Sequence, residues 1–144
     1  MRGIRRILVG LAFGAVLVAP PAPLARSQPA ASDDPTVRRA TVLVDHYLRA
    51  LAQGNVPQIQ GLLGGRAYGR RKRLLEENAA YQGLLIERYS GATYRILGHR
   101  WLDPETLAMD VRIVLADSEE VVTRFLFAQE KGRLVIAGET DPGL

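Results

Sequence analysis

The sequence predicts an α+β domain in which three N-terminal helices pack on a curved four-stranded antiparallel sheet. Apolar residues recur at intervals of three and four from residue 35 to about residue 89, which is typical of helices with one buried face. After Gly91 the interval becomes two, which is typical of strands with one buried face. Because short connectors join these later runs, we expect an antiparallel meander whose one face is covered by the helices.

The first helix is predicted over residues 35–53. The carboxylate of Asp34 can accept a hydrogen bond from a free amide of the first turn, and Pro35 is tolerated at the first helical position. Gly54 then ends the helix. Its apolar face is formed by Val37, Ala40, Thr41, Val44, Leu48 and Leu51.

Two further helices are predicted before Gly91. Asn55 and Gln58 have the spacing of a capping box and begin a short second helix, which Gly64 and Gly65 end. A third helix is expected from about 71 to 89, after a basic segment interrupted by Gly69. Lys72 and Arg73 precede Glu76 and Glu77 by four residues, a spacing that favours ion pairs on a helix surface.

Four strands are predicted over residues 92–102, 107–116, 121–129 and 133–139. The second of them has the clearest alternation, with Leu107, Met109, Val111, Ile113 and Leu115 on one face. The sequence therefore predicts a single α+β domain over residues 35–140, followed by a short tail over 141–144.

Residues 1–27 are typical of an export signal. Arginines at positions 2, 5 and 6 precede an uncharged run over 7–19, and prolines then end the run before it is long enough to span a membrane. We expect cleavage after Ser27, with Ala25 or Ala30 as alternative positions, and a flexible lead-in over 28–34. The protein is then periplasmic or secreted, with at most peripheral membrane association. The alternative is an uncleaved leader that acts as a short signal anchor.

The charge balance argues against nucleic acid as a partner. Nineteen Lys and Arg residues stand against fifteen Asp and Glu residues in the whole chain. Four of these cations lie in residues 1–27, so the chain from Gln28 onward has fifteen charges of each sign. A protein that binds a polyanion is expected to carry an excess of positive charge. The absence of cysteine excludes disulfides, thiolate metal sites and a cysteine nucleophile.

No motif in the sequence specifies a cofactor or a metal. The two histidines, His46 and His99, lack the neighbouring ligands that zinc requires. The basic segment gives one binding hypothesis, a patch for anionic headgroups or an acidic partner. Its residues are Arg66, Arg70, Arg71, Lys72 and Arg73. The alternative is that these charges are simply solvated, as charge runs usually are.

Two segments of the chain resemble the nuclear transport factor 2-like superfamily of SnoaL-like and cystatin-like α+β domains. They are Tyr47–Asn55, which closes a helix at Gly-Asn, and Phe125–Ile136, which forms a hairpin with its turn at a glycine. The resemblance covers roughly residues 36–140 and implies a cone-shaped fold, although no strand is visible over 64–72. A second, narrower resemblance, over Tyr81–Leu97, is to periplasmic phospholipid-carrier proteins of the Mla type.

The superfamily resemblance implies a pocket in the cone and a set of candidate residues that line it. Tyr47, Tyr94 and Arg112 are expected to contact a ligand. Tyr47 together with Asp110 or His99 is the candidate set for an alternative function, an isomerase, dehydratase or cyclase. Asp110 has a second interpretation as a surface carboxylate paired with Arg112 or Arg124. Because no acid–base pair is evident, we expect a non-enzymatic module that binds a small apolar or lipid-like ligand or a partner protein. Homodimerisation through the uncovered sheet face is a further expectation.

Overall fold

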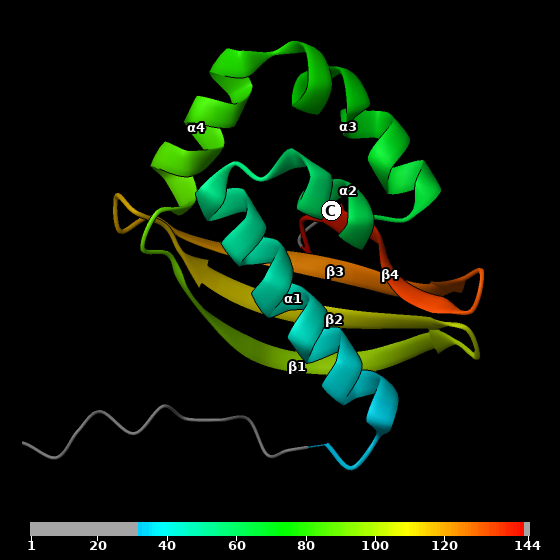
Figure 1. Cartoon of the computed structure of the whole chain (residues 1–144). Coiled ribbons are helices and arrows are strands. Elements are labelled where there is room, and N and C mark those ends of the chain that lie inside the picture. Colours follow the sequence, from blue (N-terminus) through cyan, green and yellow to red (C-terminus); the bar gives the residue numbers. More distant parts are fainter. Residues whose placement is uncertain (1–31, 143–144) are drawn as a thin grey trace, which may run out of the picture.

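The computed structural model describes residues 32–142 and confirms the predicted α+β fold class (Figure 1). Four helices precede a four-stranded antiparallel sheet, and the helices lie over one face of that sheet. The predicted leader over 1–27 and its cleavage near Ser27 lie outside the described residues. So do residues 28–31 of the lead-in and the last two residues of the tail.

The first two helices have the capping residues that the sequence predicts. In α1 (Pro35–Gln53), the Thr36 amide donates to Asp34 Oδ1 over 2.7 Å, and Gly54 ends the helix with a left-handed φ of 60°. This φ favours glycine because a Cβ would strain the backbone there. In α2 (Val56–Leu62), the side chain of Asn55 accepts from the Gln58 amide.

The predicted third helix is corrected by the structure, which has two helices in its place. These are α3 (Gly65–Glu77) and α4 (Ala79–Tyr89), so the basic segment is helical throughout. The break lies at Asn78, whose backbone is extended and whose side chain accepts from the Tyr81 amide as the N-cap of α4. Asparagine favours a cap over a helix interior because its side chain competes for backbone hydrogen bonds. The bend allows α3 to pack on the last strand while α4 packs on α1.

The sheet is a meander in which each strand pairs with the next one along the chain. Its strands are β1 (Thr93–Asp103), β2 (Thr106–Val114), β3 (Glu120–Glu130) and β4 (Arg133–Thr140). Met109 lies opposite His99 on one side and Phe125 on the other, which places these three residues at the same level of the sheet. The β3–β4 turn uses two residues with positive φ, Lys131 and Gly132.

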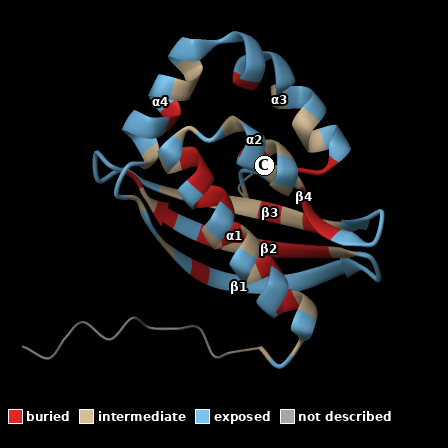
Figure 2. Cartoon of the chain, in the orientation of Figure 1, coloured by how far each residue is buried: buried red, intermediate tan, exposed pale blue. Residues whose placement is uncertain are grey.

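The hydrophobic core lies between α1 and the inner face of the sheet, as the buried residues in Figure 2 show. Tyr47 from α1 meets Phe125 from β3 edge to face, with ring centroids 6.0 Å apart. The largest fully buried side chains are Tyr47, Phe125, Phe127, Leu51, Ile59, Leu75, Leu107, Met109, Ile113, Ile136, Val44 and Val111.

The segment between α2 and α3 closes the free edge of β4. Leu63 forms an isolated parallel bridge with Ile136, and the Gly64 amide donates to the Ile136 carbonyl over 2.7 Å. Residues 65–77 are helical, in keeping with the absence of a predicted strand there. A Cβ on Gly64 would lie 2.6 Å from Glu130 Oε1 and 3.0 Å from Val135 Cγ2, so the close approach of this segment requires glycine.

Candidate functional site

Three polar side chains meet inside the fold, each from a different element. Tyr47 lies on α1, Arg71 on α3 and Glu139 on β4, and we call them the interior cluster. Arg71 donates from Nη1 to the Tyr47 hydroxyl and from Nη2 to Glu139 Oε2, the second contact spanning 2.6 Å. Tyr47 is almost fully buried, while the side chains of Arg71 and Glu139 keep 30% and 19% of their exposure. One guanidinium therefore ties α1, α3 and β4 together.

A β-bulge turns Glu139 toward the interior. The β3–β4 register pairs Phe127 with Ile136 but Leu126 with Gly138, so one residue of β4 is skipped. A bulge of this kind shifts the alternation of side chains by one position. Glu139 consequently lies opposite the buried Phe125, on the inner face of the sheet. Strict alternation from Leu134 and Ile136 would have placed Glu139 on the outer face, and for that reason the sequence did not reveal it.

The environment of the interior cluster keeps its tyrosine protonated. Burial is the main cause that holds the pKa of the Tyr47 hydroxyl well above its ordinary value of 10.0, and the Glu139 carboxylate raises it further. Burial likewise raises the pKa of Tyr89. Glu139 Oε1 is buried and has no hydrogen-bond partner among residues 32–142. The members of the interior cluster bind one another. The guanidinium of Arg71 is engaged by Tyr47 and Glu139 and is therefore not available to a ligand.

The structure places the residues of the predicted basic patch in different environments on α3. Arg71 turns inward to the interior cluster and is not part of an exposed surface. Lys72 and Arg73 form ion pairs with Glu76 and Glu77 over 3.9 and 3.7 Å, at the spacing that the sequence predicts. Arg66 and Arg70 are exposed, and no ion pair between described residues involves them.

The other predicted site residues are not brought together with Tyr47. Asp110 accepts both the Nε and Nη2 hydrogen bonds of Arg124, over 2.7 and 2.9 Å, and this pairing lowers the pKa of the Asp110 carboxyl. Its interpretation as a surface carboxylate paired with Arg124 therefore fits the structure better than a role as a base. His99 is exposed on β1.

The residues of the predicted ligand set lie in different parts of the structure. Tyr94 is half-buried, and its hydroxyl lies 3.3 Å from Asp45 Oδ1. Arg112 is exposed between the buried Val111 and Ile113, which places it on the face of the sheet opposite Tyr47. Because successive residues of a strand point to opposite faces, Arg112 and Tyr47 cannot line one cavity.

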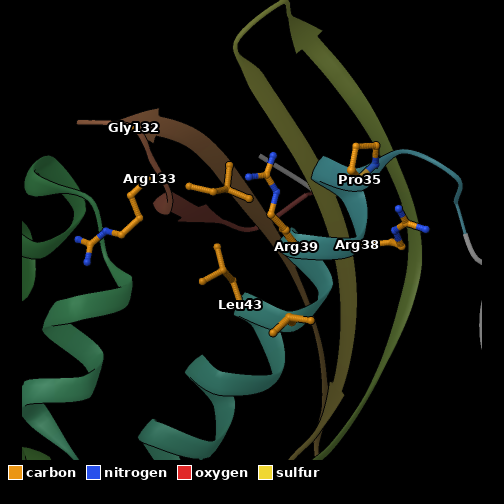
Figure 3. Close-up of a pocket in the computed structure, with 8 residues that line it drawn as sticks. Pro35, Arg38, Arg39, Leu43, Gly132 and Arg133 are labelled. Atoms are coloured by element: carbon orange, nitrogen blue, oxygen red, sulfur yellow. The ribbon is translucent and has the colours of Figure 1, made fainter.

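The structure has a groove between α1 and the β3–β4 turn that the sequence did not predict. Its volume is about 550 Å³, and we call it the α1–β4 groove. It is lined by Pro35, Arg38, Arg39, Val42, Leu43, Gly132, Arg133 and Leu134 (Figure 3). Figure 3 shows Arg39 and Leu43 on the side of α1 that faces Arg133, and Arg38 on the opposite side of the helix.

The α1–β4 groove combines an apolar lining with uncompensated positive charge. Its apolar side chains come from both elements, and Val42 is 52% exposed although it is aliphatic. No acidic residue lines the groove, and no ion pair between described residues involves Arg38, Arg39 or Arg133. Concave sites of about 300–1,000 Å³ with an apolar lining and a few polar groups are typical of ligand pockets. The arginines lie nearly a hundred residues apart in the chain, so sequence spacing could not reveal the groove.

The described residues give no indication of a metal centre or of a membrane span. No group of three or more potential metal-ligating side chains occurs among residues 32–142. Within the same range, no helix has both the length and the apolar character that crossing a bilayer requires.

Comparison with solved structures identifies the type of fold. The structure is similar to that of a designed nuclear transport factor 2-like protein, with a TM-score of 0.55. The fold is nuclear transport factor 2-like. The similarity covers 73% of this chain and 97% of the designed chain, at 14% sequence identity. No family model matches the sequence, and neither does any curated protein.

Proposed function

We propose that this protein is an exported, non-enzymatic binding module for a small amphipathic anion, a molecule with an apolar chain and one anionic group. The observation that carries the proposal is the α1–β4 groove, where an apolar lining lies beside arginines without acidic partners. The apolar chain is expected to contact Leu43 and Leu134, and the anionic group to contact Arg39 and Arg133. A fatty acid and an acidic phospholipid share this chemistry.

Each part of the groove has a separate energetic role. Burying the apolar chain contributes about 25 cal/mol per Å² of apolar surface removed from water. The arginines add charge-assisted hydrogen bonds, and a guanidinium can bind a carboxylate or a phosphate through two donors. A ligand that lacks either part is therefore expected to bind weakly. The groove is therefore expected to select a molecule that carries both an apolar chain and an anionic group.

The direct test measures binding of dodecanoate, dodecanol and acetate by titration calorimetry below the micelle concentration of the lipids. Dodecanoate is expected to bind at least about tenfold more tightly than either dodecanol or acetate, which corresponds to about 1.4 kcal/mol. The double variant Arg39→Gln/Arg133→Gln should lose this preference. The matched control, Arg66→Gln/Arg70→Gln, removes two equally unpaired charges from α3 and should keep it. Equal binding of dodecanoate and dodecanol would contradict the proposed role of the arginines.

Export is the second part of the proposal and has its own test. The motivating observation is the predicted leader over residues 1–27. The protein recovered from the periplasm or the medium of a bacterial host is expected to have the intact mass of a chain that begins at Gln28. A protein that keeps Met1 and stays with the membrane fraction would instead support the signal-anchor alternative.

An enzymatic function rests on the acid–base candidates Asp110 and His99. In the structure Asp110 is held by Arg124, and His99 is exposed at an edge strand. The binding function therefore has better support in the geometry. Homodimerisation stays a prediction, and sedimentation equilibrium of the exported protein tests it.

A further inference from the structure

The face of the sheet that the helices leave uncovered carries a second concentration of arginine. In Figure 1 the helices lie on one side of the four strands only. Outward positions of β1, β2 and β3 adjoin one another in register, and we call them the outer sheet face. Its charged residues are Arg95, Arg100, Asp103, Asp110, Arg112, Glu120, Arg124 and Glu130. It also carries Ala108, Val122 and Leu126 between those charges.

The positive charges on the outer sheet face are only partly compensated. Arg124 engages both carboxylate oxygens of Asp110, and Arg112 lies 3.8 Å from Glu120 in an exposed ion pair. No ion pair between described residues involves Arg95 or Arg100, and both are exposed. Asp103 and Glu130, at the ends of the face, accept hydrogen bonds from the Glu105 and Gly65 amides, so Arg95 and Arg100 are left without an ion-pair partner among the described residues.

The register also places two of these arginines against one another. Arg95 in β1 lies directly opposite Arg112 in β2, on the same face of the sheet. Like charges directly opposite one another across a strand pair are destabilising. A carboxylate placed between these two guanidinium groups would convert the repulsion into two attractive contacts. The arrangement is therefore better suited to a complex with an anion than to the isolated chain.

The composition of the face also fits a protein partner. All of its cations are arginines, and the two lysines of the described chain lie elsewhere, on α3 and in the β3–β4 turn. Arginine is enriched at protein interfaces and lysine is depleted, because the planar guanidinium binds carboxylates with fixed geometry. Val122 is 38% exposed and lies next to Arg112 in register, so an apolar contact adjoins the charges.

We propose that the outer sheet face docks an acidic segment of a partner protein, with carboxylates that bind Arg95, Arg100 and Arg112. A second copy of this chain is a poorer occupant, because the Asp110 and Glu120 carboxylates of its face are already paired with Arg124 and Arg112.

The proposal is tested by fluorescence anisotropy with a labelled peptide of alternating glutamate and glycine. At about 0.05 M salt we expect saturable binding that weakens steeply by about 0.3 M, as exposed charge contacts do. The variant Arg95→Gln/Arg100→Gln breaks no ion pair and should weaken binding at least about fivefold. Two matched controls, Arg66→Gln/Arg70→Gln and Arg39→Gln/Arg133→Gln, should bind as the wild type does. The second control also separates this surface from the α1–β4 groove.

Three results would overturn the proposal. Equal weakening by all three double variants would show that the peptide responds only to overall charge. Binding to vesicles with about 30% anionic phospholipid, lost in Arg95→Gln/Arg100→Gln while the peptide does not bind, would assign the face to a membrane. A dimer in sedimentation equilibrium that the same variant dissociates would assign the face to a second copy of the chain.

Discussion

The interior cluster and the α1–β4 groove use the same side chain in opposite ways. In the interior cluster, the guanidinium of Arg71 is half-buried and engaged by a carboxylate and a hydroxyl of its own chain. In the groove, the guanidinium groups of Arg39 and Arg133 have no acidic partner among the described residues, and both residues line the groove beside apolar side chains. Pairing, and not residue type, therefore separates an arginine that stabilises the fold from one that is available to a ligand.

The largest effect expected from this comparison is on stability, at Arg71. The substitution Arg71→Met leaves the Glu139 carboxylate and the Tyr47 hydroxyl buried without their partner. Breaking a fully buried ion pair costs about 3–5 kcal/mol, and the residual exposure of Arg71 reduces this to about 2 kcal/mol. Urea denaturation measures the loss of unfolding free energy. The control Arg70→Met, one residue earlier and exposed, should change it by less than about 0.5 kcal/mol. Similar values for both variants would contradict the structural role of Arg71.

Tyr47→Phe should have the next largest effect, and one that depends on pH. Removal of the hydroxyl deletes one hydrogen bond with Arg71 and costs about 1 kcal/mol at pH 7. Burial raises the pKa of Tyr47 in the folded state, so only the unfolded chain loses this proton just above pH 10. The stability that Tyr47 contributes is thus complete below pH 10 and falls as the pH rises beyond it. Denaturation between pH 8 and 11 should show a steeper decline for the wild type than for Tyr47→Phe, and parallel curves would refute the assignment.

The groove arginines should contrast with both interior residues. Arg39→Gln/Arg133→Gln removes charges that have no partner in the described chain, so the unfolding free energy should change by less than about 0.5 kcal/mol. Thermal denaturation without ligand measures this. A loss comparable to that of Arg71→Met would show that these arginines stabilise the fold, and it would remove the distinction between the two regions.

The smallest effect is expected at Asp110. Its ion pair with Arg124 lies on the outer sheet face and resembles the interior Arg71–Glu139 pair only in its geometry. Asp110→Asn removes an exposed ion pair with Arg124 and should cost about 0.5 kcal/mol at pH 7. Arg124 lowers the pKa of Asp110 in the folded state, so this contribution exists above the ordinary pKa of 3.8 and is lost as the pH falls below it. The stabilities of the wild type and the variant in acid denaturation should therefore converge as the pH falls progressively below 3.8. A cost as large as that of Arg71→Met would mean that exposure does not weaken this pair.

Local patterns predicted most of the fold. The caps at Asp34 and Asn55, the left-handed Gly54 and the alternation along β2 lie within a few residues of the structure they specify. The missed break at Asn78 follows from the same physics, because asparagine is also a capping residue. The long apolar stripe on either side of it favoured a single helix.

The sites could not be predicted, because each is assembled by tertiary contacts. Glu139 reaches the interior only through a β-bulge, and the bulge has no local signal comparable to a turn glycine. Arg39 and Arg133 line one groove because the start of α1 lies beside the β3–β4 turn. Asp110 is a candidate base only through the superfamily resemblance, and the alternative that the sequence offered, a surface carboxylate paired with Arg124, fits the structure better.

An NMR titration with dodecanoate compares the two regions most directly. We expect the amide shifts to concentrate at Arg39, Leu43 and residues 132–134, while the amide signals of Tyr47, Arg71 and Glu139 do not move. Shifts confined to Tyr47, Arg71 and Glu139, with none along the α1–β4 groove, would show that the ligand enters the interior and would contradict the account.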